Sequence, residues 1–427
     1  MGLIAWAKGN CIRGLRPFAI TVLCCAVVVF SGCASWPQEL PPKASFKGIE
    51  FLGHVSSTGQ KNSADPIRVL YIHGMGIHEF SDPDALLRQL TTAMGLHQVP
   101  PSQLAPPNAF DFNPPFLRPY PILIGAGSGP PAELYQYDFT SGDGKMSLSF
   151  SFLLWSPLTT GLKVPLANPS APEPASINKL GKDMMNNNIS DAMIYAGTYR
   201  KVIRPVVEQA LCLFIGGKTD VDDVRKCHGG SYNGRTAVIT HSLGGYILMD
   251  AYWDLSGNNP TKPAVPAEQN ASFKLLLQLD EFFMLANQLP LLNLTTLTSN
   301  ESAELTNKSV TPTPHNELMN HFLREWSAVH RLKDKLNHSS QKEAKLELVA
   351  ISDPNDILSY VVSNDSVKDS NIVTYNVFLP NVETNWFHIF ANPVVAHTGY
   401  MSNDTDMKII VCGMTEGVIN SCGDSTK

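Results

Sequence analysis

The segment Thr236-Ala237-Val238-Ile239-Thr240-His241-Ser242-Leu243-Gly244-Gly245 decides how the chain is expected to fold. Its apolar and β-branched start predicts a buried strand, and the residues after it predict a helix over 245–255. A nucleophile on a tight turn between strand and helix needs small neighbours, and Gly244 supplies one two residues after Ser242. Such a turn directs the hydroxyl toward the helix N-terminus, where free N–H groups favour negative charge. The segment therefore makes Ser242 a candidate nucleophile.

Strands and helices alternate on both sides of this segment, which predicts an α/β fold with a mostly parallel sheet covered by helices on both faces. The strands are expected at 67–72, 133–139 (as a hairpin with the next one), 146–155, 236–240, 282–285, 346–351, 373–378 and 408–411. The helices are expected at 82–95, where Asp82 is a candidate cap, and at 190–215, 245–255 and 317–336.

Two stretches rich in Pro and Gly interrupt this alternation, at about 98–131 and 156–188. Irregular insertions between the strands of α/β enzymes often form caps over a site, and we expect that role here. Residues 33–64 are rich in Pro, Ser and Gly and read as a tether. The folded domain is therefore expected to span residues 65–427.

Composition excludes several classes of protein. The 427 residues include 43% apolar and 16% charged residues, which is incompatible with a disordered polyelectrolyte. Lys and Arg number 32 against 38 Asp and Glu, a net charge of −6 with no basic stripe, so nucleic acid is not an expected partner. No HExxH, CxxC or calcium-loop pattern occurs, so neither a metal nor an organic cofactor is expected.

The N-terminus has the pattern of a signal peptide over residues 1–32. Lys8, Arg13 and Arg16 precede a run without charge over 18–30, which is too short for a membrane-spanning helix of about 20 residues. The run ends in Phe30-Ser31-Gly32-Cys33, which resembles the lipobox of bacterial lipoproteins, with Phe30 where Leu is usual.

That resemblance implies that Cys33 carries a diacylglycerol, which would tether the protein to a membrane. Ala34, in place of Asp, resembles lipoproteins that are sent to the outer membrane of Gram-negative bacteria. The expected location is therefore the cell envelope. An uncleaved anchor and an ordinary secretory signal remain alternatives.

Four cysteines remain once the signal peptide and the lipidated Cys33 are set aside: Cys212, Cys227, Cys412 and Cys422. Export would place them in an oxidising compartment, where an even number suggests disulfides. Four cysteines allow three pairings. The shortest loops favour Cys212 with Cys227 and Cys412 with Cys422.

The Ser242 segment resembles the G-x-S-x-G nucleophile elbow of the α/β-hydrolases, and its His241-Ser242-Leu243-Gly244 core is similar to that of many lipases and esterases. Thr240 replaces the first Gly, so the turn must open slightly. His73-Gly74-Met75-Gly76, directly after the first predicted strand, resembles the HG-type motif of the same family. The resemblance implies that the amides of Met75 and Leu243 form the oxyanion hole.

The family order of serine, acid and histidine then points to the other two catalytic groups. Asp356, followed by two apolar residues after the strand at 346–351, matches the acid, and Asp353 before a proline is the alternative. His397 follows the strand at 373–378 and matches the base, with His388 in an aromatic stretch as its competitor.

These residues predict a serine hydrolase that cleaves carboxylic esters, of lipids or of other acyl compounds, through an acyl-enzyme. Asn287 and Gln288, near the end of a further predicted strand, are candidate substrate contacts. A peptidase or an acyltransferase with the same triad remains an alternative. So does a non-catalytic envelope lipoprotein that uses the fold for binding.

Overall fold

The computed structural model describes residues 44–53, 66–105, 115–125, 130–166, 174–220, 222–230, 234–257, 265–296, 317–337, 345–362, 369–381 and 392–422. The predicted signal peptide, Cys33 and His388 lie outside these residues. Within them, no helix has the length and apolar character that crossing a bilayer requires.

A mixed sheet forms the centre of the molecule, and in the described part of the chain its strands follow the order β12-β11-β10-β9-β2-β6-β5-β3, with β4 beside β5. The strands are β2 (Ile67–Ile72), β3 (Leu96–Gln98), β4 (Ile122–Ile124), β5 (Ala132–Ser141), β6 (Ser147–Leu154), β9 (Thr236–His241), β10 (Leu279–Leu285), β11 (Leu346–Ser352) and β12 (Ile372–Phe378). All pairs from β12 to β6 are parallel, whereas β5 is antiparallel to β6, β3 and β4. The predicted α/β class with a mostly parallel sheet is confirmed, as is the hairpin of β5 and β6.

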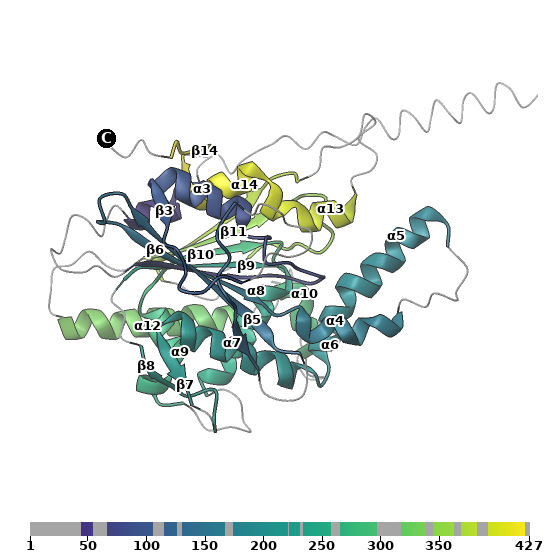
Figure 1. Ribbon diagram of the computed structural model, residues 1–427, viewed down its shortest axis with the longest axis horizontal. Helices are drawn as coiled ribbons and strands as arrows, with labels where there is room; N and C mark the ends of the chain where they lie inside the picture. Colours follow the sequence, from purple (N-terminus) through teal and green to yellow (C-terminus); the bar gives the residue numbers. More distant parts are fainter. Residues whose placement is uncertain are drawn as a thin grey trace, which may run out of the picture.

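Helices cover both faces of this sheet (Figure 1). One face carries α3 (Asp84–Met94), α13 (Pro393–Thr398), η5 (Gly399–Ser402) and α14 (Asp404–Cys412). The other carries α7 (Arg200–Phe214), α8 (Leu243–Leu255), α9 (Ala271–Leu276), α10 (Leu289–Asn293) and α12 (Glu317–Asn337). The short turn η3 (Ala267–Gln269) precedes α9, and η4 (Leu294–Thr296) follows α10.

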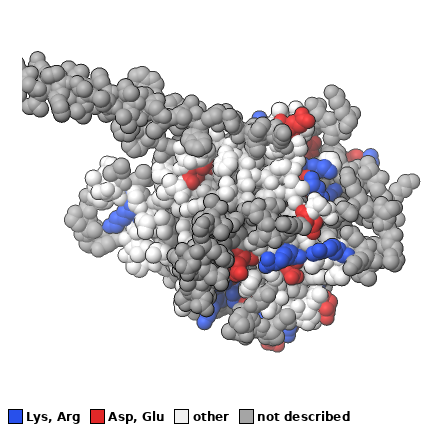
Figure 2. Space-filling model, turned by 180° about the vertical axis from the view of Figure 1, so that it is seen from behind, with Lys and Arg blue, Asp and Glu red and all other residues white. Residues whose placement is uncertain are grey.

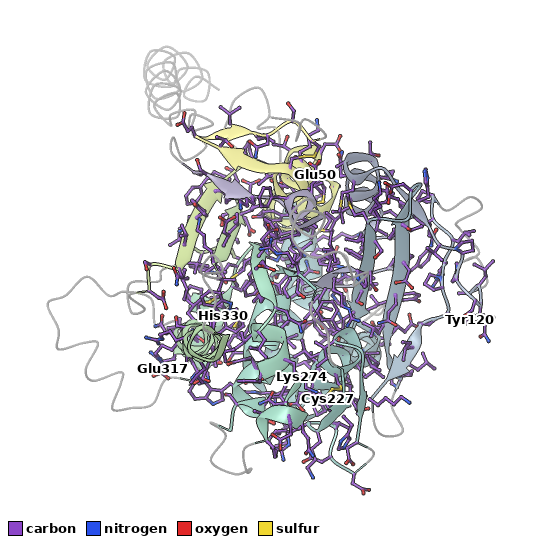
Figure 3. The ribbon with its side chains drawn as sticks, turned by 90° about the vertical axis from the view of Figure 1, so that its left-hand side faces the viewer. Glu50, Tyr120, Cys227, Lys274, Glu317 and His330 are labelled. Carbon is purple, nitrogen blue, oxygen red and sulfur yellow. A yellow bond between two sulfur atoms is a disulfide. The ribbon has the colours of Figure 1, made fainter. Side chains whose placement is uncertain are left out.

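Each strand contributes side chains to the apolar layers on both faces of the sheet, because successive side chains point to opposite faces. On β2, Val69 and Tyr71 pack under α3 and α14, whereas Leu70 and Ile72 pack against α7 and α8. The side chains drawn in Figure 3 fill both layers, with Glu50 on one side of the sheet and Cys227 and His330 on the other.

Two of the predicted elements are wrong. The helix expected over 190–215 is two helices, α6 (Ser190–Ala196) and α7, because the chain becomes extended at Gly197 (φ −83°, ψ −162°). The strand expected over 408–411 is part of α14, whose first turn is capped by the side chain of Asn403. A run of four apolar residues fits a buried helix as well as a strand, so periodicity alone misassigned it. The expected cap at Asp82 is also wrong, because Pro83 precedes α3 and no side chain caps it.

The tether expected over 33–64 is wrong for residues 44–53, which belong to the folded body. Here β1 (Phe46–Lys47) pairs antiparallel with β13 (Gly413–Thr415), which also pairs with β14 (Val418–Ile419). Phe46, Ile49 and Leu52 are buried in the core beside α14. The structure of residues 44–53 is therefore determined by their buried apolar side chains, although the composition of the region is typical of a loop.

The two insertions differ from the expectation of irregular caps. Described residues of the first, 98–131, add β4 to the edge of the sheet. The second, 156–188, is largely helical and comprises α4 (Pro157–Lys163), η1 (Val164–Leu166), α5 (Ser176–Met184) and most of the π-helical turn η2 (Met185–Ile189). In Figure 1, α5 projects away from the body of the molecule.

Both predicted disulfides are present. Cys212 on α7 is bonded to Cys227, the first residue of β8 (Cys227–Gly229), which pairs with β7 (Gly217–Thr219). Cys412 at the end of α14 is bonded to Cys422. On the face shown in Figure 2, acidic and basic side chains are interspersed among uncharged surface.

Candidate active site

Ser242 lies on a sharp turn between β9 and α8. Its backbone has φ 53° and ψ −123°, a conformation that L-residues rarely adopt and that persists only where the surroundings enforce it. The amide of Ser242 donates to the carbonyl oxygen of Leu285 at 2.8 Å. A Cβ atom on Gly244 would lie 2.5 Å from the carbonyl oxygen of Ile72, so only glycine lets α8 pack so closely on the end of β2.

The same geometry explains how Thr240 fits where the related motif has glycine. Thr240 lies beside Gly245, at which a Cβ atom would be 3.2 Å from the threonine Oγ1. Because Gly245 has no side chain, the first turn of α8 leaves room for the larger residue. In this chain the small residue that makes room for the turn is therefore Gly245, three residues after Ser242, and not the residue at position 240.

Three side chains that are far apart in the sequence meet at this turn. The Nε2 atom of His397 lies 2.8 Å from Ser242 Oγ, and its Nδ1 atom lies 3.0 Å from both carboxylate oxygens of Asp356. All three residues are buried. Because a carboxylate only accepts, Nδ1 carries the proton, and Nε2 presents its lone pair to the serine hydroxyl.

Asp356 is held by two further donors. The Leu358 amide donates to its Oδ1 atom at 2.9 Å, and the Tyr400 hydroxyl donates to Oδ2 at 3.0 Å. Burial and the Asp356 charge raise the pKa of Tyr400 well above its usual value, so the phenol keeps its proton. These bonds fix the carboxylate that faces His397.

The side chain of Asp353, the alternative acid, binds backbone amides of the neighbouring turn and loop instead of His397. Its carboxylate accepts from the amides of Asn355 at 2.7 Å and Asn381 at 2.6 Å, and burial raises its pKa. Its own amide donates to the Tyr400 hydroxyl at 2.7 Å. It therefore lies beside the triad without contacting His397. His388, the competing base, lies outside the described residues.

The loop after β2 lies against the serine. A Cβ atom on Gly74 would be 2.6 Å from Ser242 Cβ, so this position requires glycine. His73 is a buried structural residue: its Nε2 atom accepts from the amides of Trp155 at 2.9 Å and Ser156 at 3.2 Å. Burial lowers the pKa of His73 well below its usual value, which keeps that lone pair available.

The two amides expected to form an oxyanion hole flank the nucleophile. Leu243 follows Ser242 as the first residue of α8, and Met75 follows Gly74, the residue in contact with the serine. Both positions are buried. An amide at a helix N-terminus beside a second backbone N–H is the kind of environment that stabilises a developing negative charge.

A buried ion pair that sequence reasoning missed fixes the next residue of this loop. The Gly76 amide donates to Asp191 Oδ2 at 2.8 Å, and the Lys163 ammonium contacts the same oxygen at 2.9 Å. Lys163 also donates to the carbonyl oxygen of Asn187 at 3.0 Å. The pair joins α4 and α6 to the loop after β2, and no local sequence pattern announces partners 115 residues apart.

Three residues near the base have different roles. His241 Nε2 donates to the carbonyl oxygen of His397 at 2.9 Å and so supports the end of α13, which carries the candidate base. Gln288 Nε2 lies 3.5 Å from His397 Nε2, at the site. Asn287 donates to the Tyr360 carbonyl oxygen and accepts from the Leu289 amide, so its amide group is used within the fold.

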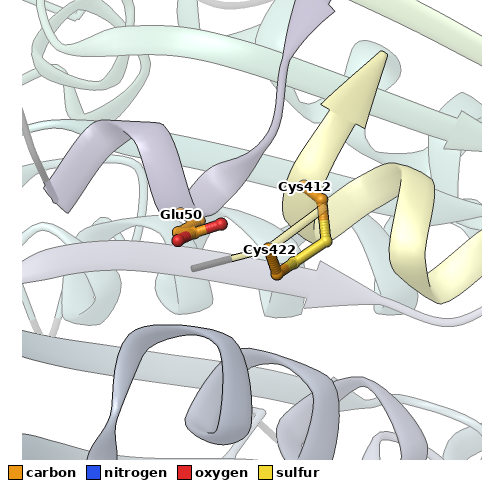
Figure 4. Close-up of side chains that lie close together, drawn as sticks. All are labelled: Glu50, Cys412 and Cys422. Carbon is orange, nitrogen blue, oxygen red and sulfur yellow. A yellow bond between two sulfur atoms is a disulfide. The ribbon is translucent and has the colours of Figure 1, made fainter. Parts of the chain in front are cut away.

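One group of potential metal ligands was found among the described residues, and it is not at this site. Glu50 lies with Cys412 and Cys422 within 4.8 Å (Figure 4). The two sulfur atoms are bonded to each other, so neither is a thiolate, the form in which cysteine binds metals. This group is therefore part of the fold.

No protein-family model matches the sequence, and no curated protein matches it. The chemistry of the site is therefore argued from its geometry. A hydroxyl on a strained turn, an imidazole and a carboxylate in hydrogen-bonded order form a set that can activate an oxygen nucleophile.

Proposed function

We propose that this chain is a serine hydrolase that cleaves carboxylic esters, built on an α/β-hydrolase fold. The observation that carries the proposal is the relay in which Ser242 Oγ lies 2.8 Å from His397 Nε2, and His397 Nδ1 lies 3.0 Å from the Asp356 carboxylate. Burial of all three groups excludes competing water and strengthens their interaction.

In the proposed reaction, His397 Nε2 removes the hydroxyl proton as Ser242 Oγ attacks the ester carbonyl carbon. Asp356 keeps the imidazole in the required tautomer and stabilises the imidazolium. The amides of Met75 and Leu243 receive the negative oxygen of the tetrahedral intermediate. His397 then returns the proton to the departing alcohol oxygen, and the acyl-enzyme is hydrolysed by water that His397 activates.

The topology supports the proposed fold assignment. The serine follows β9 at the centre of the sheet, the acid follows β11, and the base follows β12, which is the order of the α/β-hydrolase triad. The carboxyl ends of parallel strands meet at one edge of the sheet, where α/β proteins bind ligands. Each proposed catalytic residue thus comes from a segment that follows a strand at that edge: Ser242 from a turn, Asp356 from a loop and His397 from α13.

An apolar rim supports an acyl substrate. Exposed aliphatic residues lie on the segments that follow β2, β6, β11 and β12, the same segments that carry or adjoin the site: Ile77, Leu162, Val164, Ile357, Val361 and Val395. Exposed aliphatic side chains on the segments around a site favour a substrate with an apolar part. We include in the proposal that the protein acts at the cell envelope through a lipid on Cys33, and the two disulfides support an exported protein.

Labelling with a fluorophosphonate probe tests the hydrolase proposal. The probe should label the wild type covalently, and Ser242→Ala should abolish both labelling and the hydrolysis of p-nitrophenyl butyrate, a loss of about 10⁴-fold or more. Ser256→Ala is the matched control, because Ser256 Oγ also lies 2.9 Å from a histidine nitrogen, that of His321.

The control should keep wild-type labelling and activity. Absence of labelling in the wild type, or equal labelling of Ser242→Ala, would defeat the proposal. Esters of increasing acyl length then measure chain-length preference, and faster cleavage of peptide substrates would replace the esterase assignment by a peptidase.

A further inference from the structure

A cavity with polar and apolar walls lies directly beside the proposed catalytic residues. It has a volume of about 490 Å³, within the range of small-molecule sites. Its lining includes Met75 and Gly76 from the loop after β2, His241 before the serine, and Thr398 after the base. The opposite wall comes from α3 and from the segment of η5 and α14. The cavity therefore adjoins the reacting centre without being part of the triad.

Two buried polar side chains line this cavity with an atom that no described part of the chain satisfies. The hydroxyl of Tyr71 and the Nδ1 atom of His241 have no hydrogen-bond partner among the described residues, although Tyr71 is 0% and His241 2% exposed. Tyr71 pairs with Ile239 across β2 and β9, and His241 follows two residues later on the same face. The two side chains are thus diagonal neighbours. Burying an unpaired polar atom costs about 1–3 kcal/mol, so such atoms call for an explanation.

The hydrogen bonds of His241 determine whether its Nδ1 atom is a donor or an acceptor. Its Nε2 atom lies 2.9 Å from the carbonyl oxygen of His397, which only accepts, so Nε2 carries the proton. Burial lowers the pKa of His241 well below its usual value and keeps the ring neutral. Nδ1 is therefore an acceptor. The Tyr71 phenol, whose pKa burial raises, remains protonated and offers a donor.

The charges around the cavity disfavour an anion. Three carboxylates line it, those of Asp82, Asp84 and Asp404, against the guanidinium of Arg88 and the imidazole of His78, which contacts Asp82. Polar Ser81 and Ser402 add hydroxyl groups. A phosphate or carboxylate would be repelled, and an alkyl chain would leave the buried polar atoms unpaired. A neutral hydroxyl group, in contrast, accepts from Tyr71 and donates to His241.

We propose that this cavity binds the alcohol portion of the ester substrate, and that this portion is a neutral polyol, such as a glycerol or sugar unit, recognised by Tyr71 and His241. The proposal rests on the proposed hydrolase function and adds the class of leaving group. It also divides the site: exposed aliphatic residues outside the cavity, such as Leu162 and Val395, receive the acyl chain, and the cavity receives the alcohol.

Hydrolysis of three butyrate esters by the mature protein tests this proposal. Glyceryl monobutyrate, butyl butyrate and butyrylcholine share the acyl group and differ only in the alcohol. The wild type should show the highest kcat/KM for glyceryl monobutyrate. Tyr71→Phe, which removes one oxygen atom, should lower that kcat/KM by about three- to tenfold and leave butyl butyrate unchanged.

Tyr137→Phe is the matched control. Tyr137 is also buried under the same face of the sheet, on β5, but does not line the cavity. It should leave all three substrates at wild-type values, and both variants should unfold at or near the wild-type temperature.

Each other outcome overturns the proposal in a recognisable way. Equal loss on both neutral esters in Tyr71→Phe would assign Tyr71 a structural role. Preference for butyrylcholine would replace the polyol by a cation, and preference for butyl butyrate would remove the polar subsite. In each case labelling of Ser242 by fluorophosphonate would still hold, so failure of this inference is distinct from failure of the hydrolase proposal.

Discussion

Helix α8 has a serine–histidine pair at each end, and only one of them has the geometry of a catalytic site. At its start, Ser242 Oγ lies 2.8 Å from His397 Nε2, and at its end Ser256 Oγ lies 2.9 Å from His321 Nε2. The distances are nearly equal. The difference between the pairs therefore lies in what surrounds them.

The backbone and the helix separate the two serines. Ser242 has φ 53° and ψ −123° and precedes α8, whereas Ser256 has φ −75° and ψ 0° and ends it. Negative charge is stabilised at a helix N-terminus and destabilised at a C-terminus. The Ser256 hydroxyl also donates to the carbonyl oxygen of Trp253 at 3.1 Å. Its proton is thus engaged by an acceptor that cannot act as a base.

The two histidines differ in their electrostatic environment. His397 donates to the Asp356 carboxylate, which favours the imidazolium that catalysis would form. Burial, and secondly the charge of Arg324, lower the pKa of His321 to about 4. An imidazole of such low basicity is a poor proton acceptor at neutral pH. A short serine–histidine distance therefore identifies a site only together with the turn, the helix end and the acid.

The largest loss of activity is expected when Asp356, the proposed acid, is replaced. Asp356→Asn keeps the size of the side chain but lets its amide face His397 Nδ1, which favours the wrong imidazole tautomer. We expect kcat to fall by about 10⁴-fold with little change in KM. Steady-state hydrolysis of p-nitrophenyl butyrate measures this.

Asp353→Asn is the control for that variant, since Asp353 neighbours the triad and contacts Tyr400 only through its amide. It should keep activity within about tenfold of the wild type, because its carboxylate contacts the amides of Asn355 and Asn381 rather than the imidazole. An active Asp356→Asn beside an inactive Asp353→Asn would exchange their roles.

A smaller effect is expected from Tyr400, a positioning residue behind the acid. Tyr400→Phe removes the bond to Asp356 Oδ2, and we expect kcat to fall about tenfold at unchanged KM. Tyr375→Phe is the control, because it also loses a hydrogen bond, to the Ser45 carbonyl oxygen, but outside the triad. A rise in KM at constant kcat would show that Tyr400 acts on the substrate instead of the relay.

The residues that create this contrast were only partly predictable from sequence. The local pattern sufficed to propose Ser242, whereas Asp356 and His397 were proposed from the order of the triad in the family that this segment resembles, together with the predicted strands before them. Tyr400 and the Lys163–Asp191 pair gave no signal, because their partners are defined only by packing between distant segments.

The same limit applies to the fold. The central strands are long apolar runs whose burial on both faces fixes their type. Residues 408–411 and 44–53 were misassigned because short segments take their structure from contacts: α14 packs on α3, and β1 pairs with β13 near the other end of the chain. Local composition carries little information about such contacts.

The smallest expected effect concerns Ser256 and His321 at the end of α8, and it is measured as a change in the free energy of unfolding. The unfolded chain binds a proton at His321 near pH 6.5, whereas the folded chain does so near pH 4. Between these values the unfolded state holds more protons, so the free energy of unfolding falls as the pH falls. The stabilisation is complete above pH 6.5 and is lost progressively toward pH 4. After allowance for solvent screening, it amounts to about 1–2 kcal/mol.

Urea unfolding at pH 7.0 and pH 4.5 measures this effect, with His321→Gln as the variant. The buried His73 and His241 also have lowered pKa values, but they contribute to both proteins and cancel in the difference. The drop in free energy between the two pH values should be smaller in His321→Gln by about 1 kcal/mol, while labelling of Ser242 stays unchanged. Equal drops would mean that His321 titrates near its ordinary value. Basicity would then not distinguish the two histidines, and the contrast would rest on the turn and the helix end alone.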